Sequence, residues 1–110
     1  MKTAEAIKLL KPYIIWVLAP KIESEDPNIQ YYYDFTQSIK EYTKVFEELK
    51  AEWKWQPVTI NDFKEVISGI AASSNGKTPL ILNLCDGDEI NGAPGVSVIH
   101  ELEKHGLIYT

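Results

Sequence analysis

Residues 80–95 read LILNLCDGDEINGAPG, an apolar run that opens into an acidic, glycine-rich loop and then into a helical pattern. Loops held between a buried strand and a helix are where α/β proteins place their ligand-binding residues. Here residues 86–89 contain three carboxylates around Gly87, which lets the backbone approach a ligand closely. The stretch therefore predicts a strand, a loop and a helix of an α/β protein, with the loop near a polar ligand.

Three further strands are predicted from short apolar runs. Residues 13–18 are β-branched and aromatic without alternation, which is typical of a central strand covered on both faces. Residues 55–60 predict a second strand, and Pro57 places it at a sheet edge because proline cannot donate to a strand ladder. Residues 80–84 form the third strand, and residues 107–109 begin a fourth.

The helix between the first two strands has the clearest pattern in the chain. Asp34 and Gln37 predict its start as a capping box, in which a carboxylate accepts an early backbone N–H and the glutamine reaches back. Its apolar residues form one stripe, which favours an amphipathic helix docked on a sheet over a coiled coil. The stripe consists of Phe35, Ile39, Tyr42, Phe46, Leu49 and Trp53.

Two more helices are predicted from the same kind of pattern. Asn61 is expected to cap the first of them, which ends near Asn75 and Gly76. The other spans residues 95–105 and is expected to end at Gly106, with Leu107 packed on Leu102 as in a Schellman motif. Residues 1–11 predict a short N-terminal helix or arm ended by Pro12.

The element order predicts the fold class. Alternating strands and helices favour an α/β, three-layer Rossmann-like domain of four mostly parallel strands in the order 2-1-3-4, with helices on both faces. The 110 residues suffice for a single domain with its own core. Because the chain stops within the fourth strand, we expect residues 1–110 to be the N-terminal fragment of a longer protein.

Composition and charge argue against some classes of function. The chain is 45% apolar and 25% charged, as in ordinary globular proteins. A net charge of -5 without a basic cluster argues against nucleic-acid binding. The longest apolar run, residues 13–19, is too short to span a membrane. The single Cys85 cannot form an internal disulfide, so a cytoplasmic location is expected.

Two acidic loops are expected to meet at one edge of the sheet. In a parallel sheet the ligand crevice lies where the strand order reverses, which brings residues 20–34 and 86–94 together. Residues 21–34 have no clear period and predict a long loop. Facing carboxylates would favour a substrate ammonium or a metal ion. These carboxylates are Glu23, Glu25 and Asp26 in the first loop and Asp86, Asp88 and Glu89 in the second.

The residues of the acidic loop do not match the sequence motifs of two known types of ligand-binding loop. An EF-hand starting at Asp86 would have Ile90 at its fifth position and Ser97 at its twelfth, so no calcium loop is predicted. A phosphate loop needs a lysine and a hydroxyl residue directly after Gly92, where this chain has Ala93 and Pro94. No metal site is assigned. A solvated turn, with glycines supplying positive φ angles, remains the alternative for the acidic loop.

For the cysteine, the histidines and the tyrosines, a structural role is an alternative to a functional one. Cys85 is more typical of a small buried hydrophobe than of a nucleophile, because no histidine is near it in sequence. His100 and His105 are expected on a solvated helix surface. Residues 31–33, three tyrosines, could stack on a ligand, whereas packing of the loop onto the domain is the more ordinary alternative. No catalytic residue is assigned.

The last third of the chain resembles a known family. Residues 82–87 (LNLCDG), Gly95 and residues 102–110 (LEKHGLIYT) are similar to the N-terminal domain of D-alanine–D-alanine ligases and related ATP-grasp ligases. The family has a His-Gly pair where this chain has Cys85 and Asp86. It also has a Glu-Val-Ser segment after its first strand that is absent here, so the amino-acid specificity stays open.

The resemblance implies a function. The chain would be a pre-ATP-grasp domain whose strand-end loops enclose an amino-acid-like substrate, in an enzyme family that serves peptidoglycan synthesis. ATP and Mg²⁺ would be held by the two ATP-grasp lobes of the full-length protein, and the fragment alone would bind no cofactor and be inactive. The implied substrate-binding residues are Asp86, Gly87, Asp88 and Glu89, with Glu23 and Glu25 assigned by position.

Two further functions stay open from the sequence. One is a free-standing α/β module that binds a small ligand or regulates without catalysis. The other is a metal-dependent enzyme complete in this chain, for which no ligand set is found. The expected partners are the amino-acid-like substrate and the remaining ATP-grasp domains, while homodimerisation is left open and neither nucleic acid nor membrane is expected.

Overall fold

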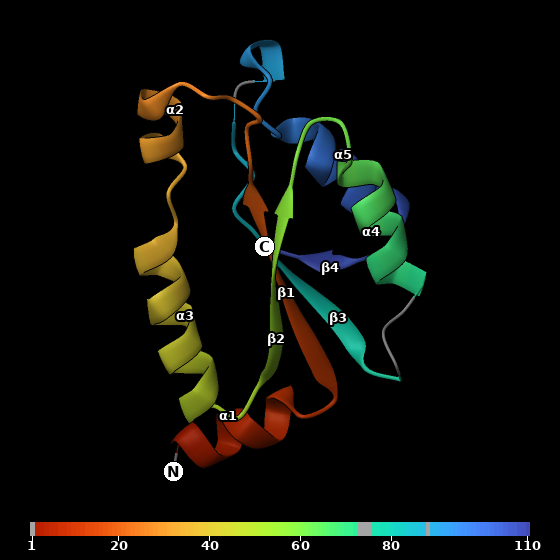
Figure 1. The fold of residues 1–110 in the computed structure, drawn as a ribbon. Helices are drawn as coiled ribbons and strands as arrows, with labels where there is room; N and C mark the ends of the chain where they lie inside the picture. The colour runs from red at the N-terminus through yellow and green to blue at the C-terminus, as the bar shows by residue number, and fades with distance from the viewer. Residues whose placement is uncertain (1, 73–75, 88) are drawn as a thin grey trace.

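The computed structural model describes residues 2–72, 76–87 and 89–110 and has three layers, helices on either side of a central sheet (Figure 1). The four strands are all parallel and lie in the order β2-β1-β3-β4, which confirms the predicted α/β class and strand order. No helix within these described ranges is both long and apolar enough to cross a bilayer. The elements are α1 (Lys2–Leu10), β1 (Tyr13–Pro20), α2 (Pro27–Tyr32), α3 (Thr36–Glu48), β2 (Glu52–Val58), α4 (Phe63–Ala72), β3 (Thr78–Asn83), the 3-10 turn η1 (Glu89–Asn91), α5 (Val96–Lys104) and β4 (Ile108–Tyr109).

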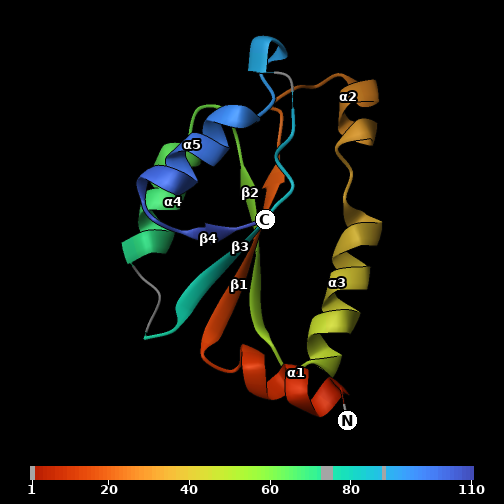
Figure 2. The same cartoon turned by 180° about the vertical axis from the view of Figure 1, so that it is seen from behind.

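Right-handed crossovers place the helices on opposite faces. The chain leaves β1 toward β2 on one side and returns from β2 to β3 and β4 on the other, so α3 covers one face while α4 and α5 cover the second (Figures 1 and 2). The views agree that α1 lies below the amino ends of the strands. The carboxyl ends of the strands face the opposite edge, where α2 and η1 project.

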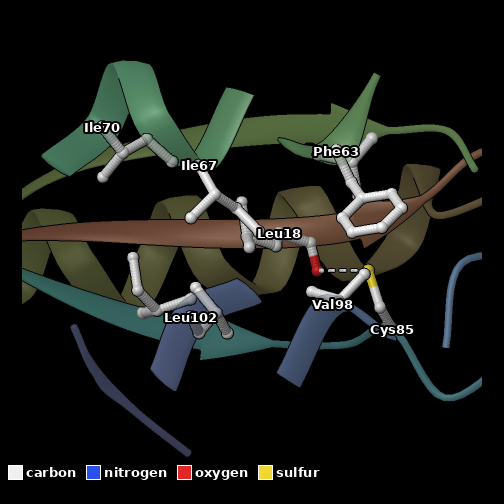
Figure 3. Packing of buried hydrophobic residues seen from close by; sticks show 9 residues of the cluster. Leu18, Phe63, Ile67, Ile70, Cys85, Val98 and Leu102 are labelled. Atoms are coloured by element: carbon white, nitrogen blue, oxygen red, sulfur yellow. Dashed lines mark hydrogen bonds between the residues drawn. The ribbon is translucent and has the colours of Figure 1, made fainter. Parts of the chain in front are cut away.

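Side chains of β1 point alternately to the two faces of the sheet and contribute to an apolar core on each face. Ile15 and Val17 point to the α3 side, where they join Phe46. Leu18 points to the other side and packs with Ile67 of α4. Figure 3 shows this second core, to which α4, α5 and Cys85 also contribute. β1 is therefore covered on both faces, as its unalternating apolar run predicts.

Helix α3 is shorter than its apolar stripe predicts. It ends at Glu48, and Lys50 then takes a left-handed conformation with φ 51°. The Ala51 N–H donates to Phe46 O at 2.9 Å, which closes the helix end. Trp53 instead lies on β2, where its ring packs 5.1 Å from that of Phe46. The prediction was wrong there because a strand residue facing the same core imitates the next helical step.

Two predicted caps are also wrong in detail. Asp34 does accept hydrogen bonds from Thr36 at the start of α3, but the Gln37 side chain donates to Glu41 rather than reaching back. At α4 the cap is Thr59, not Asn61. The Thr59 N–H donates to the Asp62 carboxylate at 2.7 Å, and the Asp62 N–H donates to the Thr59 hydroxyl at 3.1 Å. This is a reciprocal box with Asp in place of Glu.

Residues 21–34 are not a featureless loop. They contain α2, whose N-cap Asp26 accepts the Asn28 N–H at 2.9 Å and whose first turn begins with Pro27. An Asp followed by Pro is a helix-start signal that overrides the lack of apolar period. None of the six described residues of α2 is buried, so no stripe exists for a period to detect.

Glycines with positive φ angles lie between α4 and β3 and between α5 and β4. After α5, Gly106 has φ +67° and the Leu107 N–H donates to Leu102 O at 3.1 Å, which confirms the predicted Schellman motif. Gly76 has φ +80°, while Asn75, predicted at the end of α4, lies outside the described residues. Pro57 lies on β2 at the sheet edge, as predicted.

Candidate functional site

A cleft of about 540 Å³ opens at the carboxyl edge of the sheet, above the point where the strand order reverses between β1 and β3. One wall comes from the segment after β1 and the other from the loop after β3. The predicted meeting of residues 20–34 and 86–94 is confirmed by this cleft. Its lining residues are Ile22, Asn28, Ile29, Tyr32, Tyr33, Asp86, Gly87 and Ala93.

The loop after β3 is closed at its base by two glycines. The Gly87 N–H donates to Pro94 O at 2.9 Å, which joins the two arms of the loop. A Cβ built on Gly95 would overlap the Gly87 carbonyl oxygen, and one built on Gly87 would overlap Ala93. Both positions therefore need glycine for close backbone approach, and not for a positive φ angle.

Glu89 is committed to the start of α5. Its carboxylate accepts the Ser97 hydroxyl at 2.8 Å, the Ser97 N–H at 3.1 Å and the Gly95 N–H at 3.3 Å. The Ser97 hydroxyl lowers the pKa of Glu89 most, and the backbone N–H groups of Ser97 and Gly95 lower it further. The structure places this predicted ligand-binding carboxylate on a helix N-terminus, where it satisfies N–H groups of the first turn.

Asp86 stands in contrast at the other end of the same loop. It is exposed and lines the cleft. Among the described residues its carboxylate accepts no hydrogen bond and has no cationic partner, so its negative charge is available to a ligand. Asp88, the third predicted carboxylate of this loop, lies outside the described residues.

The acidic residues of the first loop do not face Asp86 across this cleft. Glu23 lines a neighbouring groove of about 690 Å³ between α2, the start of α3 and the edge strand β2, which shares Ile22, Ile29 and Tyr33 with the cleft. Glu25 is exposed and lines neither of these two clefts. The expected pairing of carboxylates across one crevice is thus replaced by one carboxylate opposite apolar and aromatic side chains.

That aromatic wall comes from α2 and its end. The rings of Tyr32 and Tyr33 meet edge to face, with centroids 5.1 Å apart, and both line the cleft. Tyr32 is 78% exposed and Tyr31 is 84% exposed, so the expected packing of all three tyrosines onto the domain was wrong. The sequence prediction missed Ile22, Asn28 and Ile29 as lining residues. The Asp26-Pro27 helix start could have located the last two.

The thiol and imidazole groups have structural roles. Cys85 is 3% exposed, and burial together with the Asp86 charge raises its pKa to about 12. It donates weakly to Leu18 O at 3.8 Å (Figure 3), which confirms an inert, buried side chain. His100 is exposed as predicted, but His105 hydrogen-bonds the buried Glu101 at 3.1 Å and is only partly exposed.

These residues do not fit a nucleotide phosphate or a divalent metal. The N-terminus of α5, the place where a phosphate would bind, already holds the Glu89 carboxylate. Lys21 is the one basic residue in the segments 20–34 and 84–95. Across the described ranges no three His, Cys, Asp or Glu side chains are grouped as metal ligands. No step through ATP or Mg²⁺ is therefore assigned to residues of this chain.

Comparisons with protein-family models, with curated protein sequences and with solved structures found no match to this chain. The resemblance of residues 82–110 to an ATP-grasp ligase therefore stays a prediction, and the chemistry of the site rests on its own geometry.

Proposed function

We propose that this domain is the substrate-side domain of a cytoplasmic, ATP-dependent carboxylate–amine ligase resembling the D-alanine–D-alanine ligases, in which the cleft binds the amino group of an amino-acid substrate. The observation that carries the proposal is Asp86, whose carboxylate lines the cleft without a partner among the described residues. The fold is in agreement, because parallel α/β sheets bind ligands where the strand order reverses.

The task proposed for this domain is binding and orientation. A carboxylate at the wall of a partly enclosed cleft favours an ammonium group over a neutral or anionic one. Holding that group fixes the amino acid relative to its reacting partner, which lowers the entropic part of the barrier. The nucleotide would be held elsewhere in the ligase, since the α5 N-terminus is filled by Glu89.

Steady-state kinetics of the natural gene product test this function. Asp86→Asn keeps the size of the side chain and removes its charge, so we expect the KM for the amino acid to rise about tenfold while the KM for ATP stays unchanged. Glu25→Gln, an exposed position that lines neither described cleft, is the matched control and should change neither constant. Absence of amino-acid-dependent ATP cleavage would contradict the proposal.

A free-standing binding module is the second candidate. It is favoured by one observation, that both described walls of the cleft come from this chain. In that case the 110-residue chain would bind an amine and the natural gene product would hydrolyse no ATP. The kinetic assay therefore separates the two functions.

A further inference from the structure

We infer that the cleft selects a primary amine attached to a bulky apolar or aromatic body, and not an amine of alanine's size. The inference rests on the proposed function in one respect, the use of Asp86 as the ligand of the ammonium group. It goes further by assigning the remaining cleft wall to the rest of the substrate. Three observations carry it, and they concern charge, lining chemistry and volume.

The charge of the cleft points to a cation. Among the described lining residues, Asp86 is the one carboxylate and none is basic. The neighbouring segment adds Glu23, Glu25 and Asp26, against Lys21 alone. An anionic ligand would meet this field without a cationic partner, whereas an ammonium would gain from it.

The lining chemistry points to an apolar body beside that cation. Ile22 and Ile29 are half-buried in the cleft wall, and Ala93 is buried. Tyr32 is 78% exposed, although its ring meets that of Tyr33 edge to face, so much of its apolar surface is open to a ligand. A ligand that covers the ring and the two isoleucines removes apolar surface from water. A ligand with a single methyl group leaves these surfaces exposed.

The volume agrees with a ligand larger than alanine. The cleft measures about 540 Å³. Pockets that enclose drug-sized ligands measure about 300–1,000 Å³. Gly87 and the buried Ala93, which are packed closely on each other, form the part of the cleft wall next to Asp86. An amine with a ring or a branched chain would fill this space.

An NMR titration of the ¹⁵N-labelled 110-residue chain tests the inference with three probes. Phenethylamine carries both the ammonium and the ring, ethylamine carries the ammonium alone, and 3-phenylpropionate carries the ring with the opposite charge. We expect phenethylamine to bind about tenfold more tightly than ethylamine, since added apolar surface in a pocket gives discrimination of this order. We expect no binding of 3-phenylpropionate.

Two exposed tyrosines give a matched pair of variants. Tyr32→Ala removes a lining ring and should weaken phenethylamine to about the level of ethylamine, with ethylamine binding unchanged. Tyr31→Ala removes a ring that is equally exposed but lines the other groove, and it should change neither affinity. Because both rings are exposed, neither variant is expected to unfold the domain.

The outcomes separate this inference from the proposed function. Equal affinities for the two amines, or equal effects of the two tyrosine variants, would overturn the bulky-amine inference. The proposed function would still stand in that case if amine binding depends on Asp86. Tighter binding of 3-phenylpropionate than of phenethylamine would overturn both. Phenethylamine binding that Asp86→Asn does not weaken would overturn the proposed ammonium site even if the ring selectivity holds.

Discussion

The two walls of the cleft are built in different ways. The loop after β3 is braced by its own residues, through the Gly87–Pro94 hydrogen bond and the three donors to Glu89. The segment after β1 forms α2, which buries none of its described residues and presents exposed tyrosines. One wall is thus fixed by packing and hydrogen bonds, and the other is a surface helix held mainly through local caps.

The two carboxylates of the loop after β3 differ in whether they are free to bind a ligand. Glu89 looks equivalent to Asp86 in the sequence, yet its carboxylate is used to hold the fixed wall in shape. Asp86 is carried by that wall and keeps its charge toward the cleft. A fixed carboxylate opposite a surface helix with exposed rings can accept ligands of different shape, because the helix side has little packing to lose.

The largest effect is expected where the two arms of the fixed wall touch. Gly95→Ala inserts a Cβ against the Gly87 carbonyl oxygen, which is backbone and cannot turn away. We expect a loss of about 3 kcal/mol in the free energy of unfolding, measured by urea denaturation. Gly69→Ala, on α4, meets no atom within 4 Å and is the control. It should gain about 0.5–1 kcal/mol from helix propensity.

Equal stability changes in the two glycine variants would mean that the base of the loop is not tightly packed. The contrast between the two cleft walls would then disappear.

A smaller effect is expected from the charge of Glu89. Its pKa is lowered in the folded state, so its stabilising contribution is complete above the unfolded pKa of about 4.3 and is lost as the pH falls through the folded value. Glu89→Gln should therefore be less stable than wild type at pH 7 and should lose less stability on acidification. Thermal unfolding between neutral and acidic pH measures this.

Glu25→Gln, at an exposed position that lines neither cleft, is the control for that measurement and should follow the wild-type pH profile. The Asp34 pKa is also lowered, by Thr36, so all three proteins should share the remaining acid sensitivity. Identical profiles for Glu89→Gln and wild type would show that the carboxylate does not cap α5.

Hydrogen exchange should resolve the two walls in the unmodified chain. The N–H groups of Tyr33 and Gln30 donate to carbonyls of α2 and its N-cap, whereas that of Gly87 donates across the base of the other loop. Because α2 buries no side chain, we expect its amides to be protected about tenfold less than that of Gly87. Protection in the opposite order would contradict the assignment of the fixed wall.

The smallest effect on stability is expected at Asp86. Its carboxylate has no partner among the described residues, so Asp86→Asn should change the free energy of unfolding by less than about 0.5 kcal/mol. Urea denaturation checks this. A substantial loss would mean that Asp86, like Glu89, holds the loop together.

Much of the fold follows from periodicity in the sequence. The unalternating run on β1, the stripe of α3 and the Gly106 cap each encode a local structure that needs no distant partner to be recognised. Trp53 shows the limit, because a residue of β2 that faces the same core continues a helical spacing by coincidence. Helix α2 shows another, since a helix without a buried face has only its Asp26-Pro27 start as a signal.

The site was harder to predict than the fold. Composition shows that residues 86–89 are acidic, but only the position of Ser97 relative to Glu89 reveals that one carboxylate serves as a cap. Glu23 lines the groove beside β2 whereas Asp86 lines the cleft beside the loop after β3. Which cleft a carboxylate lines depends on the tertiary structure, and it cannot be predicted from the spacing of charged residues along the chain.

Asp86 and Glu89 can be compared as ligand-binding groups in one experiment. In the 110-residue chain with ¹³C-labelled side-chain carboxyl groups, phenethylamine is titrated at constant neutral pH. We predict that the carboxyl signal of Asp86 shifts and saturates while that of Glu89 keeps its position. A saturating shift at Glu89 with none at Asp86 would show that Asp86 is not the residue that binds the ammonium group.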